Sequence, residues 1–346
     1  MFVANCRYVS ALVLALTLIG CDWRSSSRDG TDTFSTDETE TSKRDVNVSD
    51  LPPNNSASIY VSEATKDYTD DSSPEGVYHS DVETVAAIEQ MGGVVANSGG
   101  VCQVDLSGLA LSDDLLGNLV ALSNIRSLSL NKSQINDHLM EHLKGMTMLR
   151  VLSLDENHVT DTGLEHLKGL TNLEFLYLNE TRITDTGLEH LKRLTNLREL
   201  ELNGTNVRGS GIQHLTELTK LQKLCMNDTQ IGDDGLEHLK GMKNLAMLEL
   251  NETRVTDVGL EYLKNLVKLQ GLDLVHADIT DAGLEHLSTL TALTRLVLDG
   301  TQVSNTGLEH LVGLTKLRAL SVDNTQVTDA GIKKFKTALP RCYVYP

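Results

Sequence analysis

Aromatic residues are scarce in this chain of 346 residues, where they make up only 4% of the total. Phenylalanine, tyrosine and tryptophan supply much of the buried area in ordinary globular cores. Their shortage indicates that another kind of side chain holds the fold together. It therefore disfavours a compact globular core of the usual composition.

Basic residues are too few to balance the acidic ones. The chain has 30 lysines and arginines against 48 aspartates and glutamates, which gives a formal net charge of −18. Nucleic-acid binding needs a basic face to meet the phosphates, and docking on anionic lipid needs a polybasic patch. We therefore expect no nucleic-acid partner, and a membrane contact only through an attached lipid.

Catalytic signatures are missing as well. The sequence contains no glycine-rich phosphate loop, no Gly-x-Ser-x-Gly elbow, no Cys-x-x-Cys pair and no kinase motif. We therefore expect a protein that is not an enzyme and that needs no cofactor.

What the sequence has in abundance is a 24-residue repeat. One copy covers residues 173–196 and reads LEFLYLNETRITDTGLEHLKRLTN. Aligned on their first residue, the clear copies begin at Leu149, Leu173, Leu197, Leu221, Leu245, Leu269, Leu293 and Leu317, and weaker copies begin at Ile125 and Val101. A fixed period of this length predicts a solenoid in which successive repeats stack.

Each repeat predicts a strand, a turn and a short helix. In the copy at 173–196, Leu176 and Leu178 alternate with outward residues, which is the pattern of a half-buried strand. A polar turn follows, and Asp185 is expected to cap the N-terminus of a helix with leucines at helical spacing. Gly187 in the first helical turn permits close packing against the strand.

Residues 101–340 resemble leucine-rich repeats of the Thr-Asp-x-Gly-Leu-x-x-Leu type, as the TDTGLEHL of residues 184–191 shows. The resemblance implies an α/β solenoid, or horseshoe, with a concave parallel sheet and short helices on the convex side. Bacterial exported lipoproteins with such repeats are similar. The repeats of F-box substrate receptors are more distantly similar, but they carry cysteine where this chain has Thr181. Because no F-box-like helical segment is found, a substrate-receptor role is a less favoured alternative.

Residues 1–21 predict a signal peptide. Arg7 supplies the positive start, and the apolar run Tyr8 to Ile19 is too short to span a bilayer. The run ends in Leu-Ile-Gly-Cys, which resembles a bacterial lipobox with Cys21 as the lipidated residue. This predicts an exported, lipid-anchored protein of the cell envelope that faces the periplasm or the surface. An ordinary signal peptide, and hence a secreted protein, is the alternative.

The remaining segments are interpreted as a tether and two caps. Residues 22–80 are rich in serine, threonine and acidic residues without an apolar period, which predicts a disordered acidic linker. Residues 81–100 are expected to cap the first repeat with a helix over 81–91, and residues 341–346 to cap the last. The expected apolar side of that first helix consists of Val82, Val85, Ala86 and Ile88.

Three cysteines lie outside the signal peptide. Cys102 and Cys342 fall at opposite ends of the repeat array and cannot pair within one molecule. Cys225 falls on an outward strand position, where it could be a free thiol.

Histidine recurs at one helix position, in His142, His166, His190, His214, His238, His286 and His310. Such a row could bind metal, which is one alternative function. His138, Glu141 and His142 also match an inverted zinc-protease motif. Because the Glu-His pair is the normal repeat sequence, we interpret the match as coincidence and expect no metal.

The outward residues of the strands are free to vary and form the candidate binding site. On the predicted concave face they include Val151, Phe175, Tyr177, Glu199, Glu201, Met247, Glu249, Asp273 and Arg295. Apolar anchors beside charged groups are typical of protein interfaces. We expect a protein partner with a basic patch; a structural or self-associating surface protein is the alternative.

Overall fold

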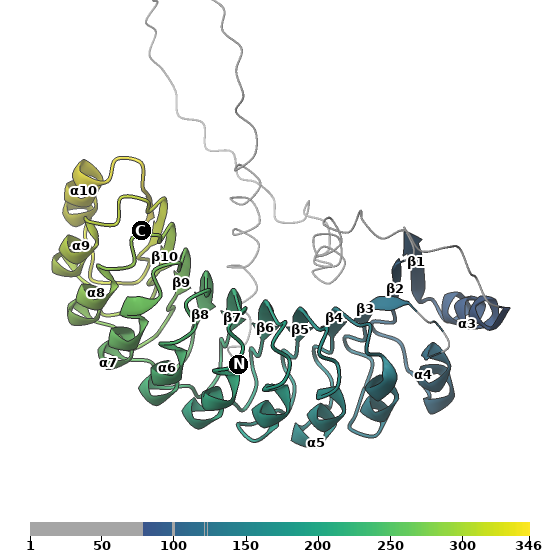
Figure 1. Cartoon of the computed structure of the whole chain (residues 1–346). Coiled ribbons are helices and arrows are strands. Elements are labelled where there is room, and N and C mark those ends of the chain that lie inside the picture. Colours follow the sequence, from purple (N-terminus) through teal and green to yellow (C-terminus); the bar gives the residue numbers. More distant parts are fainter. Residues whose placement is uncertain (1–78, 99–100, 121, 123) are drawn as a thin grey trace, which may run out of the picture. The chain divides into compact units, whose positions relative to one another are not determined.

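The computed structural model describes residues 79–98, 101–120, 122 and 124–346, and Figure 1 shows their arrangement. Their strands form one open sheet of twelve, in which each strand neighbours the next one along the chain. The signal peptide, Cys21 and the acidic linker lie outside the described residues. The predictions made for those segments therefore stay predictions.

Eleven strands follow one another in parallel, and a twelfth runs antiparallel at the N-terminal end. The central strands are three residues long and pair in register with a shift of 24 residues, so that Leu176 lies between Leu152 and Leu200. The strands are β1 (Val94–Ser98), β2 (Val101–Asp105), β3 (Ile125–Ser129), β4 (Val151–Ser153), β5 (Phe175–Tyr177), β6 (Glu199–Glu201), β7 (Lys223–Cys225), β8 (Met247–Glu249), β9 (Gly271–Asp273), β10 (Arg295–Val297), β11 (Ala319–Ser321) and β12 (Tyr343–Tyr345).

A short helix follows each strand of the repeats and returns the chain to the next one. The strands line the concave side and the helices the convex side, as the resemblance implied (Figure 1). Several helices are of the 3₁₀ type. The helices are α3 (His79–Gln90), α4 (Asp113–Leu119), η2 (Leu139–Gly145), α5 (Asp161–Leu164), η3 (Glu165–Leu167), η4 (Gly187–Leu191), η5 (Gly209–Leu215), α6 (Asp233–Leu239), α7 (Asp257–Leu260), η6 (Glu261–Asn265), α8 (Asp281–Leu287), α9 (Asn305–Leu311) and α10 (Asp329–Ala338).

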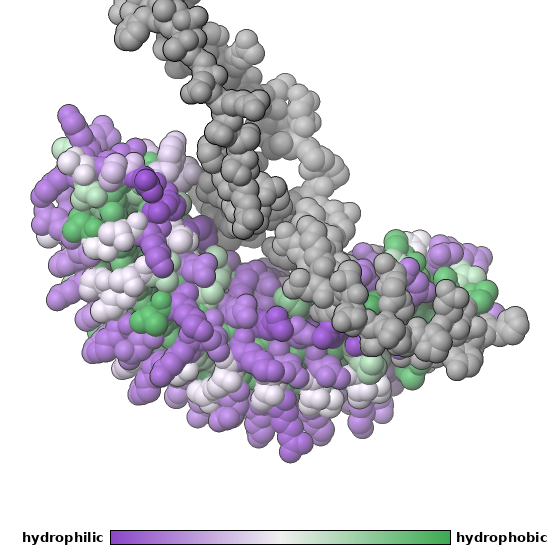
Figure 2. All heavy atoms as spheres, turned by 45° about the horizontal axis from the view of Figure 1, so that its top comes forward, coloured by the Kyte–Doolittle hydropathy of each residue, from purple (hydrophilic) through white to green (hydrophobic). Residues whose placement is uncertain are grey.

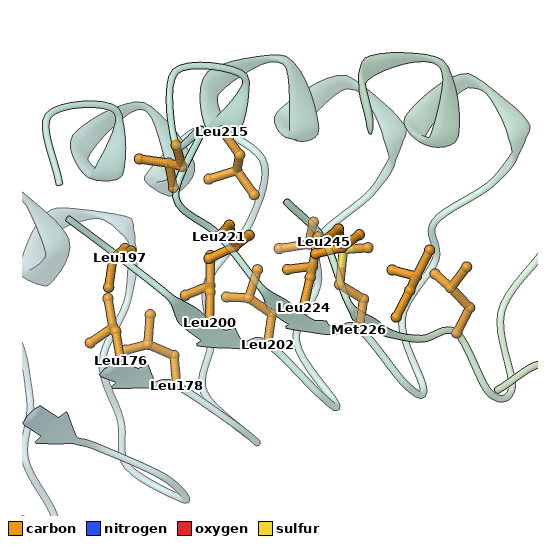
Figure 3. Packing of buried hydrophobic residues seen from close by; sticks show 14 of the residues in the cluster. Leu176, Leu178, Leu197, Leu200, Leu202, Leu215, Leu221, Leu224, Met226 and Leu245 are labelled. Atoms are coloured by element: carbon orange, nitrogen blue, oxygen red, sulfur yellow. The ribbon is translucent and has the colours of Figure 1, made fainter. Parts of the chain in front are cut away.

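Leucine fills the space between sheet and helices. Leu176, Leu200 and Leu224 point inward from three neighbouring strands, and Leu215 and Leu221 close over them (Figure 3). All five side chains are fully buried. Outside this core the visible surface of the repeats is mostly hydrophilic (Figure 2). The core thus needs few aromatic residues, because one kind of side chain recurs at the same place in every repeat.

The N-terminal cap has the predicted elements but a partly different buried side. Helix α3 is followed by β1, which pairs antiparallel with β2. Thr84 and Ile88 face the core, whereas Val82 is 55% exposed and Ala86 is also exposed. The predicted apolar side was therefore correct for Ile88 and for Val85, which is partly buried against the core, and wrong for Val82 and Ala86.

Most helices of the repeats are linked to the next one by an aspartate, which does not cap its own helix as predicted. The N-cap of a typical repeat is a threonine, such as Thr280, whose hydroxyl accepts from the amide of Ala282. The aspartate lies one residue later and binds the following repeat. Asp257 accepts from Thr280 N at 2.8 Å and from Thr280 Oγ1 at 2.6 Å. The same bonds occur in Asp137–Thr160, Asp161–Thr184, Asp233–Thr256 and Asp281–Ser304. Asn305 likewise accepts from Thr328 N, but its amide Nδ2 donates to Thr328 Oγ1.

At the junction between Gly209 and Gly232 this link is absent from the described residues. Asp185, in contrast, keeps the backbone bond, from Arg208 N, and accepts its second bond from Ser210 Oγ. Gly209 stands in the place of the aspartate, and Gly232 in the place of the threonine. A side chain at Gly209 would collide with Asp234, whose carboxylate lies 2.2 Å from an ideal Cβ. Helix α6 consequently begins at Gly232 without a side-chain cap. Both partners of the link are thus lost together.

A second ladder runs where the strands end. The side-chain oxygen of Asn179 accepts from Asn203 N at 2.9 Å, and that of Asn203 accepts from Asn227 N at 2.8 Å. The ladder continues to Val275, whose amide still donates to Asn251 Oδ1. Valine offers no acceptor to the next repeat, so the ladder is interrupted there and resumes with the bond from Asp323 N to Asp299 Oδ1 at 2.8 Å. These bonds satisfy the backbone amide of each turn and hold the turn in register with that of the neighbouring repeat.

The residue after each ladder position has a left-handed backbone. The φ angles of these residues lie between 53° and 70° in Lys132, Glu156, Glu180, Gly204, Asp228, Glu252, His276, Gly300 and Asn324. Except for Asn324, the amide of each of these residues donates to the next repeat, as in Glu180 N to Asn203 O at 2.7 Å. Glycine adopts this conformation most easily, yet most repeats place a charged residue there.

Candidate interaction surface on the concave sheet

The structure brings the nine predicted concave residues onto two adjacent rows of one sheet face. The first row joins Val151, Phe175, Glu199, Lys223, Met247, Gly271 and Arg295. The second joins Ser153, Tyr177, Glu201, Cys225, Glu249, Asp273 and Val297. Parallel strands stand about 4.8 Å apart, so side chains along each row touch one another.

The two rows differ in exposure. Phe175, Glu199, Met247 and Arg295 in the first row are half-buried, whereas Tyr177 and Glu201 in the second are buried, at 6% and 8% exposure. Alternation of residues along a strand predicts which side of the sheet they face, but not how tightly neighbouring rows close over them. The accessible part of the sheet is therefore mainly its first row.

Lys223 joins two carboxylates near the centre of the sheet. Its ammonium group lies 2.6 Å from Glu199 Oε1 and 2.6 Å from Glu201 Oε1. Burial alone would raise the pKa of Glu201, but Lys223 and a hydrogen bond from Asn179 lower it. Burial raises the pKa of Glu199 to about 7, because Lys223 only partly offsets it and Glu201 adds repulsion. Lys223 therefore neutralises part of the negative charge near the centre of the sheet.

A second ion pair lies two strands further on. Arg295 Nη1 approaches Asp273 Oδ1 at 2.6 Å, although no well-aligned hydrogen bond reaches that oxygen from the described residues. Burial raises the pKa of Asp273 to about 7 and outweighs the neighbouring guanidinium. Met247 lies over Gly271, where its sulfur would be 2.4 Å from an added Cβ. This arrangement leaves Met247 as an apolar group between the two charged clusters.

An arginine row beside the sheet was missed by the sequence interpretation. Glu174 bridges two arginines from neighbouring repeats, at 3.0 Å from Arg150 Nε and 3.1 Å from Arg198 Nε. The signal was available, because all three residues hold the same repeat position. It was missed because that position immediately precedes the strand and was not counted as part of the concave face.

Several repeats have the sequence Asn-x-Thr, such as Asn179 to Thr181, in the turn that follows the strand. Asn179 donates to Glu201 Oε2 and Asn227 donates to Glu249 Oε2, both at 2.8 Å, while the oxygens of both amides serve the ladder. The threonine of each triplet donates to the carbonyl three residues earlier, as in Thr181 to Leu178 at 2.6 Å. Both polar residues thus have structural partners within the fold.

The recurring histidines lie half-buried along the helices. Within the described residues, no group of three or more His, Cys, Asp or Glu side chains is placed to hold a metal ion. The motif residues His138 and His142 both approach Asp113 Oδ1, at 3.2 Å and 2.9 Å. The hydrogen bond from His142 is the main reason that the pKa of Asp113 is lowered. These histidines therefore join η2 to α4.

Cys225 is a free thiol but not an exposed one. It is 1% exposed, and burial raises the pKa of its thiol well above the ordinary value. A thiol that stays protonated is a poor nucleophile. Cys102 and Cys342 are also buried. The sequence placed Cys225 on the correct sheet face but overestimated its access to solvent.

No described helix is long and apolar enough to cross a bilayer.

A strand and a short helix in every 24 residues, stacked into an open sheet, define the class of repeat solenoids. The chain belongs to the leucine-rich repeat family, because the family model described as "Leucine-rich repeat region" matches residues 124–330. None of the curated proteins compared with the sequence matches it significantly.

Solved structures share the fold. An internalin, InlF, from Listeria monocytogenes is 21% identical, with a TM-score of 0.43 over 77% of this chain and 94% of its own. Internalin C2 from the same organism is 26% identical, with a TM-score of 0.49 over 66% and 91%. The plant peptide hormone receptor RGFR1, in complex with RGF2, is 19% identical, with a TM-score of 0.51 over 72% of this chain and 39% of the receptor chain.

Proposed function

We propose that this protein binds another protein through the concave sheet, without catalysis. The observation that carries the proposal is the row of half-buried side chains on strands β5 to β10, which combines apolar Phe175 and Met247 with charged Glu199 and Arg295. Apolar anchors beside charged groups are the usual composition of a binding hot spot. Leucine-rich repeat regions typically serve as scaffolds for protein binding.

The proposed partner presents an apolar group toward Phe175 and Met247 and a basic patch toward Glu199 and Glu249. Val151, Tyr177, Glu201 and Asp273 would support this surface from below, because they are mostly covered by their neighbours. Glu201 and Asp273 already have ion-pair partners in this chain. Their proposed role is to orient Lys223 and Arg295.

We further propose that the protein acts at the cell envelope, exported by residues 1–21 and held by a lipid on Cys21. The support is the lipobox-like sequence. Residues 22–80 would then serve as the tether, followed by a cap over 81–100, the repeats over 101–340 and a cap over 341–346. Mass spectrometry of the mature protein would test this, since a diacylated N-terminal Cys21 is expected. An intact Met1, or cleavage without a lipid, would contradict it.

Partner binding can be tested by capture from an envelope extract with the full chain as bait. The test variant carries Phe175→Ala, Met247→Ala and Glu249→Gln, which remove the anchors and one charge but keep an acceptor for Asn227. The control variant carries Val258→Ala, Val267→Ala and Glu261→Gln on the convex side, where both valines are more than half exposed. Bound proteins are quantified by mass spectrometry after both variants are shown to keep the wild-type circular dichroism.

A partner retained by the wild type and the control, but lost about tenfold or more by the test variant, would support the proposal. Equal retention by all three proteins would place recognition elsewhere on the molecule and overturn it. No specific partner at all would favour the alternative, a structural role for the repeat array.

A further inference from the structure

The two long edges of the repeat array differ in charge. We define the basic edge as the segments that run from the end of each helix to the start of the next strand. The acidic edge consists of the segments that run from the end of each strand to the start of the next helix. Because the strands of the repeats are parallel, all segments of one kind lie at the same edge.

The basic edge covers residues 144–150 and the equivalent segments of each repeat through 312–318. Its acidic residues are Glu174 and Glu217. Its basic residues are Lys144, Arg150, Lys168, Lys192, Arg193, Arg198, Lys220, Lys240, Lys243, Lys264, Lys268, Lys316 and Arg318. All of these basic residues except Arg150, which is half-buried, are exposed.

The acidic edge covers residues 131–138 and the equivalent segments through 323–330. Its basic residues are Lys132, Arg182, Arg208 and Arg254. Its acidic residues are Asp137, Asp155, Glu156, Asp161, Glu180, Asp185, Asp228, Asp233, Asp234, Glu252, Asp257, Asp278, Asp281, Asp299, Asp323 and Asp329. A chain of strongly negative net charge thus collects its cations at one side.

Part of this charge has no opposite partner within the described chain. Lys168 and Lys192 pair with glutamates three residues earlier, at 2.9 Å each. In contrast, Lys220 reaches only the amide oxygen of Asn196, and Lys268 makes the same contact with Asn244. Arg193 and Lys243 have no ion-pair partner in the described residues, nor do Glu180 and Asp228 on the acidic edge. These groups are available to an external partner.

We propose that the protein associates with further copies of itself by placing the basic edge of one copy against the acidic edge of the next. A second copy fits because both edges recur with the same repeat spacing, so that opposite charges can meet over many repeats. Screening over about 8 Å at physiological salt weakens the repulsion between whole molecules, but leaves edge contacts at a few ångströms effective. This inference goes beyond partner binding, since the concave sheet stays open.

The geometry of the contact determines the kind of assembly. Two different edges meet, so the contact is heterologous and each added copy leaves one edge of each sign unfilled. The average mass is therefore expected to keep rising with protein concentration instead of stopping at a dimer.

Sedimentation velocity on the full chain tests the proposal, with Cys21→Ala in every version so that no lipid drives association. Association is expected at about 100 mM NaCl, where the screening length is about 10 Å, and is expected to weaken by about tenfold or more at about 1 M, where the screening length is about 3 Å. The basic-edge variant carries Arg193→Glu, Lys220→Glu, Lys243→Glu and Lys268→Glu. The acidic-edge variant carries Glu156→Lys, Glu180→Lys, Asp228→Lys and Glu252→Lys.

Each edge variant alone is expected to associate much more weakly than the wild type, because four charge reversals remove most of the net charge of the changed edge. Mixing the two variants is expected to restore pairwise association, because the unchanged acidic edge of one variant can still meet the unchanged basic edge of the other. A control variant changes the net charge as much as the acidic-edge variant does, but on helices α3, η2 and α8, with Glu83→Lys, Glu89→Lys, Glu141→Lys and Glu285→Lys, exposed residues that are not paired with a basic-edge lysine in the described part of the chain. This control is expected to associate like the wild type.

Three outcomes would overturn the proposal. A wild-type chain that stays monomeric at low salt and high concentration shows that the edges do not attract each other. Association that survives either single edge variant shows that another surface is responsible. Loss of association in the helix control to the same extent as in the acidic-edge variant shows that net charge alone controls it.

Discussion

Asp155 interrupts a row of asparagine side chains at the end of the concave strands. Its Oδ1 accepts from Asn179 N at 2.8 Å, as an asparagine would. Burial raises its pKa to about 7, and the nearby Glu201 and Glu156 carboxylates add to the effect. A carboxyl group that is harder to ionise in the folded state stabilises the fold below its unfolded pKa of about 4. That contribution is lost as the pH rises through about 7.

We therefore predict that Asp155→Asn has a pH-dependent effect. Asparagine keeps the acceptor and removes the charge, so the variant should be more stable than the wild type by about 1–2 kcal/mol at pH 8. Near pH 4 the difference should nearly vanish, because the wild-type carboxyl is protonated there. Urea unfolding at both pH values measures this. An equal difference at both would contradict the assignment of the effect to ionisation.

Glu180 illustrates a different conflict, between backbone and side chain. Its φ angle is 55°, and its carboxylate lies over Gly204. Glu180→Gly should raise the free energy of unfolding by about 1 kcal/mol, because glycine adopts the left-handed conformation without steric cost. Arg182→Gly in the same loop, where the backbone is not left-handed, should instead lower it. Thermal unfolding of both variants checks the prediction, and a loss of stability in Glu180→Gly would refute it.

At the scale of the elements, the Asp–Thr link holds each helix to its neighbour. Asp257→Ala removes two hydrogen bonds to Thr280 and should destabilise the protein by about 1–2 kcal/mol. Asp257→Asn should cost much less, because the chain itself uses Asn305 in the same place, with bonds of 3.0 Å and 2.9 Å to Thr328. Chemical unfolding of both variants provides the test. Because both variants lose the negative charge, equal destabilisation would show that the charge matters and would contradict the hydrogen-bonding role.

The strands and helices could be predicted from the sequence, but the hydrogen bonds that connect neighbouring repeats could not. The alternation around Leu176 predicted a strand, and the repeat period predicted its parallel neighbours at Leu152 and Leu200. The role of Asp185 could not be predicted, because its partners Arg208 and Ser210 lie in the next repeat. A one-dimensional pattern shows that a polar residue recurs, but not whether it bonds within its own helix or across to another.

The candidate site was predicted to a similar extent. The period of two correctly placed Phe175 and Glu199 on one sheet face. It could not show that Lys223 would draw Glu199 and Glu201 together, because that depends on which side chains become neighbours in adjacent strands. The degree of burial of Tyr177 depends on the same lateral packing, and for this reason was not evident either.

For the molecule as a whole, the junction between Gly209 and Gly232 divides the array into two blocks. Repeat proteins are stabilised by contacts between neighbours, so a junction that lacks its link should open first. Hydrogen exchange is expected to be fastest, among the junctions of the central repeats, in the helices that flank this one. Uniform protection along the array would contradict this expectation.

Restoring the link tests the same division. The triple variant Gly209→Asp, Gly232→Thr and Asp234→Thr should raise stability by about 1–2 kcal/mol and slow exchange at the junction. Gly209→Asp alone should destabilise, because its Cβ would lie 2.2 Å from the Asp234 carboxylate. Equal effects of the single and triple variants would show that Asp234 does not occupy the vacated space.

The ladders also bear on how such a chain can change its length. Each Asp–Thr link and each hydrogen bond of the asparagine ladder reaches only the adjoining repeat. These bonds therefore do not depend on the total number of repeats. Excision of residues 173–196 would bring Asp161 to Arg208 N and Asp155 to Asn203 N, which are the kinds of bond that the removed repeat made. Unequal recombination within the gene could therefore shorten or lengthen the array by whole repeats and still leave a protein that folds.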